Sequence, residues 1–370
     1  MSLAMAKCPY CNENIEVNIN EPASICSYCG HPFITEHALN NYTKFYNKKS
    51  TAVIDRDLDA NFVIDDGVLI KYKGEKLDVV IPKGIYKIKG GCFARQNIRS
   101  VRLNDDIVEL ASENAALGAF SGCTSLKSIN LPESLMIIGD STFSGCTNLE
   151  ITSLPENLEY IGSHAFEGCQ QLTSVKVPDT VKKLKPYTFA RCYNLKKVIL
   201  PDHFTHAESY LFFSCLKLNE INMEIFDTIG DNAFNGCISI NQLHLHEGLV
   251  EIGDYAFKGC IGLNSLVLPE SLKVLGAGAF DSCKNISSIR FPEALDIIGD
   301  GAFRECESLN EVIYTRDNVK LGEDIFEECL LLKDKWSKEL LCPMCGGERE
   351  AEFLSYTCKR CGRKSLTKRG

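Results

Sequence analysis

The chain lacks the long apolar runs and the catalytic signatures that mark membrane proteins and many enzyme classes. It has no uninterrupted apolar stretch of about 18 residues, so the sequence contains no candidate transmembrane helix. It also has no nucleophile elbow, phosphate-binding glycine loop, H-E-x-x-H motif or paired-carboxylate arrangement. We therefore expect a protein that binds a partner and is not an enzyme.

Positive charge is outnumbered by negative charge. Forty Lys and Arg residues stand against 49 Asp and Glu residues, which gives a net charge of −9. This balance argues against nucleic acid as the partner of the whole molecule. The N-terminus shows no basic and apolar leader pattern. The sequence thus predicts a cytoplasmic protein, and the alternative is a surface or secreted protein whose leader was removed.

Cysteine, by contrast, is abundant, and ten of the 19 cysteines are regularly spaced. Consecutive members lie 23 residues apart, except that the step from Cys215 to Cys237 is 22. A fixed period in the range of about 20–50 residues indicates a solenoid built from stacked copies of one unit. The ten residues are Cys123, Cys146, Cys169, Cys192, Cys215, Cys237, Cys260, Cys283, Cys306 and Cys329.

Each cysteine sits in the same repeat, which reads A-F-x-G-C-x-x-L-x-x-I-x-L-P-x-x-L-x-x-I-G. Apolar residues alternate in its L-x-x-I-x-L part, as in Leu126, Ile129 and Leu131, which is strand patterning. Pro132 cannot donate to a ladder and ends that strand. The second L-x-x-I-G part predicts a turn or a short second strand on the back. Since one repeat cannot bury its apolar face, we expect a β-rich solenoid of parallel strands with roughly 11 coils over residues 58–333.

The repeated cysteines and phenylalanines are both expected to lie in the core. Free cysteine is among the most buried residue types and packs as a small apolar side chain. Aromatic rings bury large areas, which suits a phenylalanine column. We therefore predict a buried ladder of reduced thiols; the alternative is a ladder that binds metal or senses redox state.

Eight further cysteines form C-x-x-C pairs near the two ends. The pairs are separated by 14 residues in the N-terminal set and by 12 in the C-terminal set. Four thiolates from two such pairs hold one zinc ion tetrahedrally. We predict two structural zinc ions, one in a ribbon at residues 5–34 and one at 334–370, against disulfides, iron–sulfur ligation or a redox C-x-x-C. The ligands would be Cys8, Cys11, Cys26, Cys29, Cys342, Cys345, Cys358 and Cys361.

Two segments precede the first full repeat. Residues 35–57 place Leu39, Tyr42 and Phe45 at helical spacing, which predicts a short helical linker. Two apolar runs then flank Asp66-Gly67, a sequence typical of a β-hairpin turn. We expect this hairpin to cover the open N-terminal edge of the stack.

In each strand, the residues on either side of the isoleucine are expected to point outward. They make a polar face of mixed charge, which favours a peptide or protein partner; the alternative is a face that is only solvated. His244 and His246 alternatively suggest a weak metal site. The candidate binding residues on this face are Arg102, Asn130, Lys176, Lys197, Glu220, Asn222, Gln242, His244, Arg290 and Glu311.

A second candidate contact is the basic C-terminal tail. Its six cations have no acid between them and could touch phosphate, although a solvated tail is the simpler interpretation. The residues are Lys359, Arg360, Arg363, Lys364, Lys368 and Arg369.

The repeat, together with the lead-in DGVLIKYKGEKLDVVIP from Asp66 to Pro82, resembles the BspA-like leucine-rich repeats of Treponema and Bacteroides surface proteins. The resemblance covers about Phe62 to Leu332. It implies a leucine-rich-repeat solenoid in a family of mostly adhesion or interaction proteins. We therefore predict a monomeric protein–protein interaction scaffold. The alternatives are an adaptor that contacts RNA or DNA through the ribbons and tail, and a bacterial surface adhesin.

Overall fold

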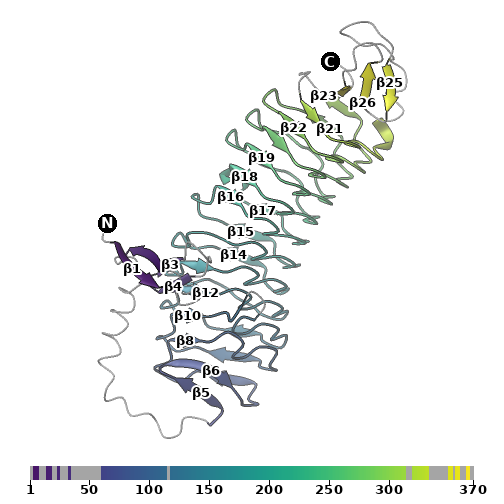
Figure 1. Cartoon of the computed structure of the whole chain (residues 1–370). Helices are drawn as coiled ribbons and strands as arrows, with labels where there is room; N and C mark the ends of the chain where they lie inside the picture. The colour runs from purple at the N-terminus through teal and green to yellow at the C-terminus, as the bar shows by residue number, and fades with distance from the viewer. Residues whose placement is uncertain are drawn as a thin grey trace.

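The central part of the chain is a long stack of coils, seen from the side in Figure 1. The computed structural model describes residues 60–114, 117–313 and 319–332 in full, and at the ends the backbone of strands within 3–34 and 349–366. The predicted parallel β-solenoid of about 11 coils is confirmed. Among the described residues, no helix has the length and apolar character needed to cross a membrane.

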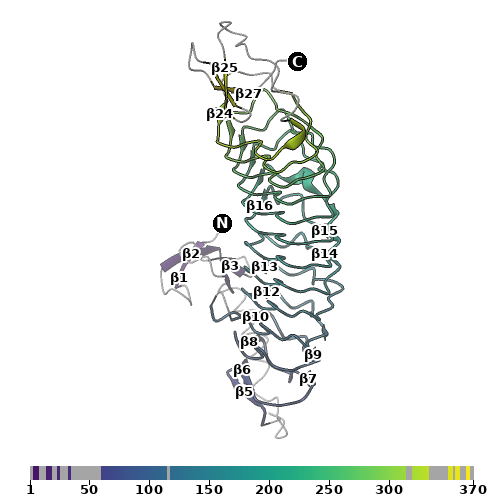
Figure 2. The same ribbon diagram turned by 90° about the vertical axis from the view of Figure 1, so that its right-hand side faces the viewer.

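The L-x-x-I-x-L segments form one ladder of short parallel strands, here called the front ladder (Figure 2). It consists of three separate groups and is not continuous. The groups are β7 (Asp78–Val80), β9 (Ser100–Arg102) and β11 (Ser128–Ile129); β14 (Ser174–Lys176), β15 (Lys197–Ile199) and β17 (Glu220–Ile221); and β21 (Ser288–Arg290) and β23 (Glu311–Ile313).

The repeat also predicts strands at residues 151–153, 242–244 and 265–267. These three predictions are wrong, because the structure has no strand there. The wider gap follows the 22-residue repeat. That coil has no proline after its strand and forms the 3₁₀ helix η1 (Met223–Ile225) at the corner instead. Backbone pairing between residues 240–245 and 263–268 is then reduced to one long hydrogen bond, from the Asn264 N–H to the Asn241 carbonyl at 3.5 Å.

The second apolar segments form a rear ladder on the opposite side of the stack, which confirms the short second strand (Figure 2). It has two groups. The first runs β5 (Phe62–Asp65), β6 (Val68–Tyr72), β8 (Lys87–Ile88), β10 (Glu109–Leu110), β12 (Ile137–Ile138) and β13 (Tyr160–Ile161). The second runs β16 (His206–Ala207), β18 (Thr228–Ile229), β19 (Glu251–Ile252), β20 (Val274–Leu275), β22 (Ile297–Ile298) and β24 (Lys320–Leu321).

Close packing of the coils explains where the rear ladder breaks. A Cβ at Gly162 would lie 2.5 Å from the Asp140 nitrogen of the preceding coil, which is too close for real atoms. Lys185 and Glu208 occupy the same repeat position in the next two coils. Their side chains prevent the close approach, and no rear strand forms between β13 and β16.

The predicted hairpin at the N-terminal edge is confirmed. Strands β5 and β6 pair antiparallel, and β6 continues in parallel into β8. Asp66 and Gly67 form the turn with φ values of 41° and 73°, a conformation that glycine adopts without steric cost. The hairpin thus covers the first coil and leaves its own outer strand at the edge.

A column of phenylalanines runs through the core of the stack. Eleven rings, from Phe93 to Phe326, stack in succession with centroid distances of 5.0–5.8 Å. All are essentially inaccessible to solvent. Because the rings are parallel and evenly spaced, each coil makes the same contact with the coil before it and the coil after it. Such a stack can be extended by adding further coils.

The predicted thiol ladder is buried, and its hydrogen bonds explain why cysteine occupies this position. Each of the ten regularly spaced thiols donates to the carbonyl of the phenylalanine in the preceding coil, with Sγ–O distances of 2.9–3.3 Å. Alanine would fit but has no donor. Cys92 is an eleventh buried, free cysteine that the period did not identify, since it stands at the alanine position before Phe93.

Short antiparallel strands lie near both termini. The N-terminal pairs are β1 (Leu3–Lys7) with β2 (Asn14–Asn18), and β3 (Ala23–Ile25) with β4 (Pro32–Ile34). The C-terminal strands β25 (Arg349–Glu352), β26 (Ser355–Cys358) and β27 (Lys364–Leu366) form one sheet. The predicted helical linker at 35–57 lies outside the described residues.

The ladder thiols are expected to resist alkylation in the folded protein. Burial raises the pKa of Cys192 and of Cys237 to about 12, so almost no thiolate is available near neutral pH. Native protein would be treated with iodoacetamide, and the labelled peptides mapped by mass spectrometry. We expect both residues to stay unlabelled until denaturant is added. Labelling of either at the rate seen in denatured protein would contradict the buried ladder.

Candidate functional site

The ten candidate binding residues all lie on the front of the stack. Nine are exposed, and Asn222 is half-buried. They are not contiguous along one uninterrupted sheet, because the front ladder breaks between β17 and β21. Gln242 and His244 fall inside this break, whereas Arg290 and Glu311 lie beyond it on β21 and β23.

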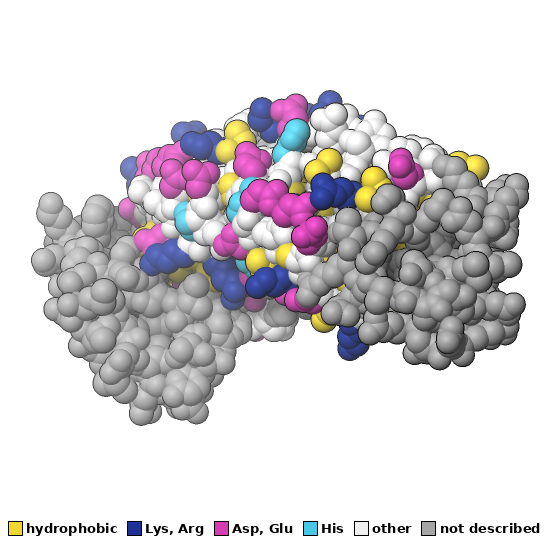
Figure 3. Space-filling model, turned by 90° about the horizontal axis from the view of Figure 1, so that it is seen from above, with side chains coloured by type: hydrophobic (Ala, Val, Ile, Leu, Met, Phe, Trp, Pro, Cys, Tyr) yellow, Lys and Arg dark blue, Asp and Glu magenta, His cyan; other side chains and the backbone are white. Residues whose placement is uncertain are grey.

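Most front charges are paired between neighbouring coils. Lys197 and Glu220 are 2.8 Å apart, and Arg290 lies 3.4 Å from Glu270. Such pairs join residues of neighbouring coils. On the face seen from above in Figure 3, acidic and basic side chains are likewise interspersed. Each exposed ion pair stabilises the fold by at most about 1 kcal/mol. Breaking such a pair to bind a partner therefore costs little free energy.

Two of the candidate residues are engaged within the solenoid. The Asn130 amide accepts a hydrogen bond from the Leu103 N–H at 2.7 Å and donates to the Leu103 carbonyl at 3.1 Å. Asn222 makes the same pair of bonds with Leu200, at 3.0 and 2.8 Å. In both cases the side chain extends the ladder past the end of a strand, so these two amides clamp adjacent coils together.

Four exposed apolar residues, here called the apolar column, share one repeat position on the front, with polar residues at that position in the coils between them. At the position just after the buried strand residue, Val267 is 78% exposed, Val80 65%, Ile199 43% and Ile313 37%. In other coils this position is occupied by Arg102, Lys176 and other polar residues. The overall composition of the face is therefore polar and does not show the apolar residues. Each of these exposed side chains is available for contact with another polypeptide.

A small cavity opens on the front beside the 22-residue repeat. It has a volume of about 60 Å³. Its apolar wall consists of Ile221, Met223 and Ile240, of which the last two are buried. Its polar lining consists of Asn219, Asn241, Gln242 and His244.

The paired histidines do not form a metal site in the described structure. The His246 ring lies 2.9 Å from the Phe226 carbonyl and 3.5 Å from Asp227, whereas His244 lines the cavity. No group of three or more His, Cys, Asp or Glu residues within the described ranges is placed to hold a metal ion.

The residues predicted to bind zinc fall almost entirely outside the described part of the chain. Only Cys358 is included, as the backbone of the last residue of β26. Of the basic tail, only Lys364 is included, as the backbone of the first residue of β27. Their predicted roles stay predictions.

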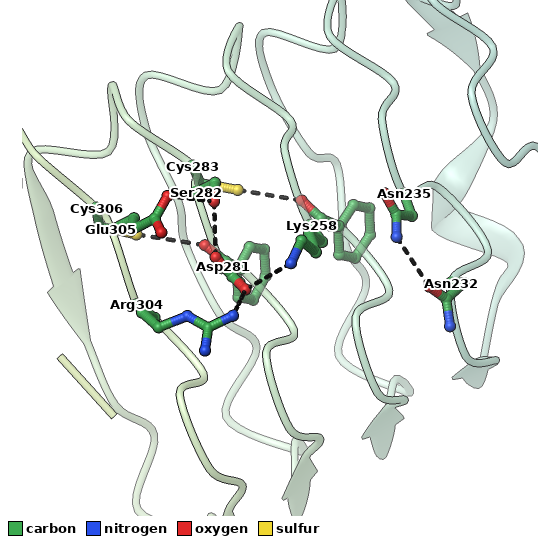
Figure 4. A network of polar contacts seen from close by, with 11 residues as sticks. Asn232, Asn235, Lys258, Asp281, Ser282, Cys283, Arg304, Glu305 and Cys306 are labelled. Atoms are coloured by element: carbon green, nitrogen blue, oxygen red, sulfur yellow. Dashed lines mark hydrogen bonds and ion pairs between the residues drawn. The ribbon is translucent and has the colours of Figure 1, made fainter. Parts of the chain in front are cut away.

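Asp281 is the centre of a buried charge cluster (Figure 4). Its carboxylate is 1% exposed, and it lies 2.9 Å from Lys258 Nζ and 2.6 Å from Arg304 Nη2, which come from the coils on either side. The Ser282 hydroxyl donates to it at 2.7 Å. Although burial opposes ionisation, the hydrogen bonds from Ser282, Lys258 and Arg304 hold the pKa of Asp281 below its usual range.

This cluster is a clamp between three coils. Both cations are already bonded to the one carboxylate, and burial closes the carboxylate to a ligand. Within its own repeat, Asp281 does not differ from an exposed acid, because the same position holds Ser144, Glu167 and Ala190 in other coils. The signal that identifies it is the opposite charge one repeat before and one repeat after.

Three aromatic side chains form a second cluster at the gap in the rear ladder. His164, Tyr187 and Tyr210 occupy one repeat position with φ near +60°, which costs a non-glycine residue about 1–2 kcal/mol. Their rings stack at centroid distances of 4.5 and 4.4 Å. Since Lys185 and Glu208 lie in the same coils, this stack joins neighbouring coils at the place where the rear strand is missing.

Removing the buried carboxylate is expected to destabilise the solenoid in a pH-dependent manner. Asp281→Asn should lower the free energy of unfolding near neutral pH by about 1–3 kcal/mol, because two cations lose a charged acceptor. The pKa of Asp281 is lower in the folded protein than in the unfolded chain, where an Asp has a pKa of about 3.9. Its ionised carboxylate therefore stabilises the fold above that pH, and this stabilisation is lost as the pH falls through the folded pKa. The difference from the native protein should therefore shrink in acid.

Urea midpoints at neutral and acidic pH measure this difference. The matched control is Asp202→Asn, at an exposed acid. An equal loss in both variants, or a loss in Asp281→Asn that does not change with pH, would contradict the clamp.

Comparison with known proteins supports the repeat assignment. The model of the BspA type leucine-rich repeat region matches residues 113–226 and 223–333, which together span more than half of the chain. These matches indicate no enzyme family. A search of curated proteins found no similar chain.

Solved bacterial structures are similar at low identity. A leucine-rich repeat protein from Bacteroides ovatus is 23% identical, with 74% of this chain and 93% of that chain covered and a TM-score of 0.39. A leucine rich cell surface protein from Faecalibacterium prausnitzii is 21% identical, with 70% and 94% covered and a TM-score of 0.43. The T. pallidum leucine rich repeat protein is 24% identical, with 73% and 85% covered and a TM-score of 0.25. On the match to the repeat model, the chain belongs to the BspA-type leucine-rich repeat family.

Proposed function

We propose that this protein is a non-enzymatic scaffold that binds another polypeptide through the front of its solenoid. The observation that carries the proposal is the exposed apolar column formed by Val80, Ile199, Val267 and Ile313. These residues lie on the same face as the charged residues predicted to bind. Apolar contacts supply affinity, and surrounding charges supply specificity.

The geometry of the stack supports this role. Successive coils repeat at about 4.8 Å, so the front offers side chains at a fixed spacing along its length. A partner that spans several coils meets both apolar and charged positions. The buried clusters, by contrast, are closed to ligands, because Asp281 and the thiols are bonded within the core.

We further propose that the two ends bind structural zinc. The N-terminal strand pairs support this, since Cys8 directly follows β1 and Cys26 directly follows β3. Each of these C-x-x-C pairs therefore falls in the connection between two paired antiparallel strands, as zinc-ribbon knuckles do. Cytoplasmic location stays a prediction from the sequence.

Charge placed on the apolar column should abolish polypeptide binding without unfolding the solenoid. The variant Ile199→Asp with Val267→Asp adds two charges at exposed positions, so core packing is unaffected. Peptides would be selected on the native protein from a random 12-residue phage library and synthesised for fluorescence anisotropy. We expect the variant to weaken binding at least about tenfold.

The control for this experiment is Ile238→Asp with Ile261→Asp. These two residues are 39% and 41% exposed but lie at the turn after the repeated cysteine and not on the front. Unchanged binding in the front variant, or equal loss in the control, would overturn the assignment of the front as the binding surface.

Zinc content tests the proposed ribbons. We expect two zinc ions per chain by native mass spectrometry, and one after Cys8→Ser with Cys11→Ser, because two of four ligands are lost. Thermal unfolding of the solenoid should stay unchanged, since its contacts are between neighbouring coils. A chain that carries no zinc, or a double variant that keeps both ions, would refute the ribbons.

A further inference from the structure

Four features coincide on the front between β17 and β21. The repeat there is one residue short, the front ladder is broken, a cavity opens, and Val267 is the most exposed large apolar side chain among the described residues. Residues 242–245 and 265–267 form no backbone hydrogen bond in this described region. No other part of the described front combines these features.

The cavity suits one aliphatic side chain. Its volume of about 60 Å³ exceeds the roughly 10–15 Å³ that one water molecule requires. Ile221, Met223 and Ile240 form the apolar part of its lining, which one small aliphatic side chain would contact, and the larger part of the lining is polar. Asn241 and Gln242 at the rim carry amides that both donate and accept hydrogen bonds, as an extended peptide backbone requires.

Two acidic residues, Glu220 and Glu224, directly adjoin residues of the cavity wall. They belong to the segment 218–254, here called the acidic segment, which contains seven acidic residues and no Lys or Arg in the sequence. Glu224 directly follows Met223 of the cavity wall, is exposed, and has no hydrogen-bond or ion-pair partner among the described residues. Glu220, beside Ile221 of the wall, is held only by the exposed pair with Lys197 at 2.8 Å. The free carboxylate of Glu224, with Glu220 beside it, attracts a cationic partner and repels an anionic one.

We propose that the cavity is the anchoring subsite for an extended basic peptide segment of a partner protein. One aliphatic side chain of the segment fills the cavity, and flanking Lys or Arg side chains pair with Glu224 and Glu220. The Gln242 and Asn241 amides bind its backbone. This inference rests on the proposed function of the front and adds the place and the chemistry of the partner.

The subsite is tested with an array of fluorescent nine-residue peptides. Each has a central Leu or Gly, and its flanks are basic, neutral or acidic. We expect binding to the native protein to be tightest for central Leu with basic flanks and to weaken as salt rises. Replacing the central Leu by Gly, or the basic flanks by acidic ones, should each weaken binding at least about tenfold.

Two variants then locate the site on the protein. Gln242→Trp covers the mouth of the cavity from an exposed position, and should abolish the preference for Leu over Gly; Ser128→Trp, at the same repeat position elsewhere on the front, is its control. Glu224→Gln should weaken binding of the basic peptide and reduce its salt dependence. Its control is Glu150→Gln, at an exposed acid outside the acidic segment.

The outcomes separate this inference from the proposed function. If peptides bind the front, as shown by loss in Ile199→Asp, but neither Gln242→Trp nor Glu224→Gln changes their affinity, the subsite is refuted and the scaffold function stands. Equal binding of basic and acidic peptides also refutes it. Binding that is insensitive to every front variant refutes both proposals.

Discussion

The structure depends on the stacking of one coil on the next through identical columns. Each Phe ring lies on the ring of its neighbour, and each thiol donates to the carbonyl of the preceding Phe, as Cys146 does to Phe120. A residue in these columns must fit the coils before and after it as well as its own. Apolar contact and hydrogen bonding therefore fix the core positions, whereas residues that point outward are free to vary and to carry recognition.

The same constraint makes irregular coils informative. Where Lys185 and Glu208 replace glycine, the rear ladder breaks, and the aromatic stack of Tyr187 and Tyr210 compensates in the same coils. Where the repeat is one residue short, the front ladder breaks, and the described structure shows no equivalent compensation there. The gap in the rear ladder is therefore bridged by other contacts, whereas the gap in the front ladder leaves a cavity and exposed apolar surface.

The period of the cysteines predicted the solenoid, the two kinds of short strand and the buried columns, because these follow from residues that every coil repeats. It did not predict features that depend on how two particular coils meet. Asn130 was expected to face a partner but binds Leu103 of the preceding coil, and Asp281 resembles a surface acid until Lys258 and Arg304 are placed beside it. The 22-residue step was visible in the sequence, but its consequence for the strands at 242–244 and 265–267 required the structure.

Hydrogen exchange of the full chain, with and without a selected binding peptide, shows directly whether the front between β17 and β21 is the binding surface. We expect bound peptide to slow amide exchange within residues 242–245 and 265–267, where the described front backbone forms no hydrogen bond. Exchange in the rear ladder and at the turns that carry Tyr187 and Tyr210 should not change. Protection confined to the rear ladder or to those turns, with none at the front, would contradict this expectation.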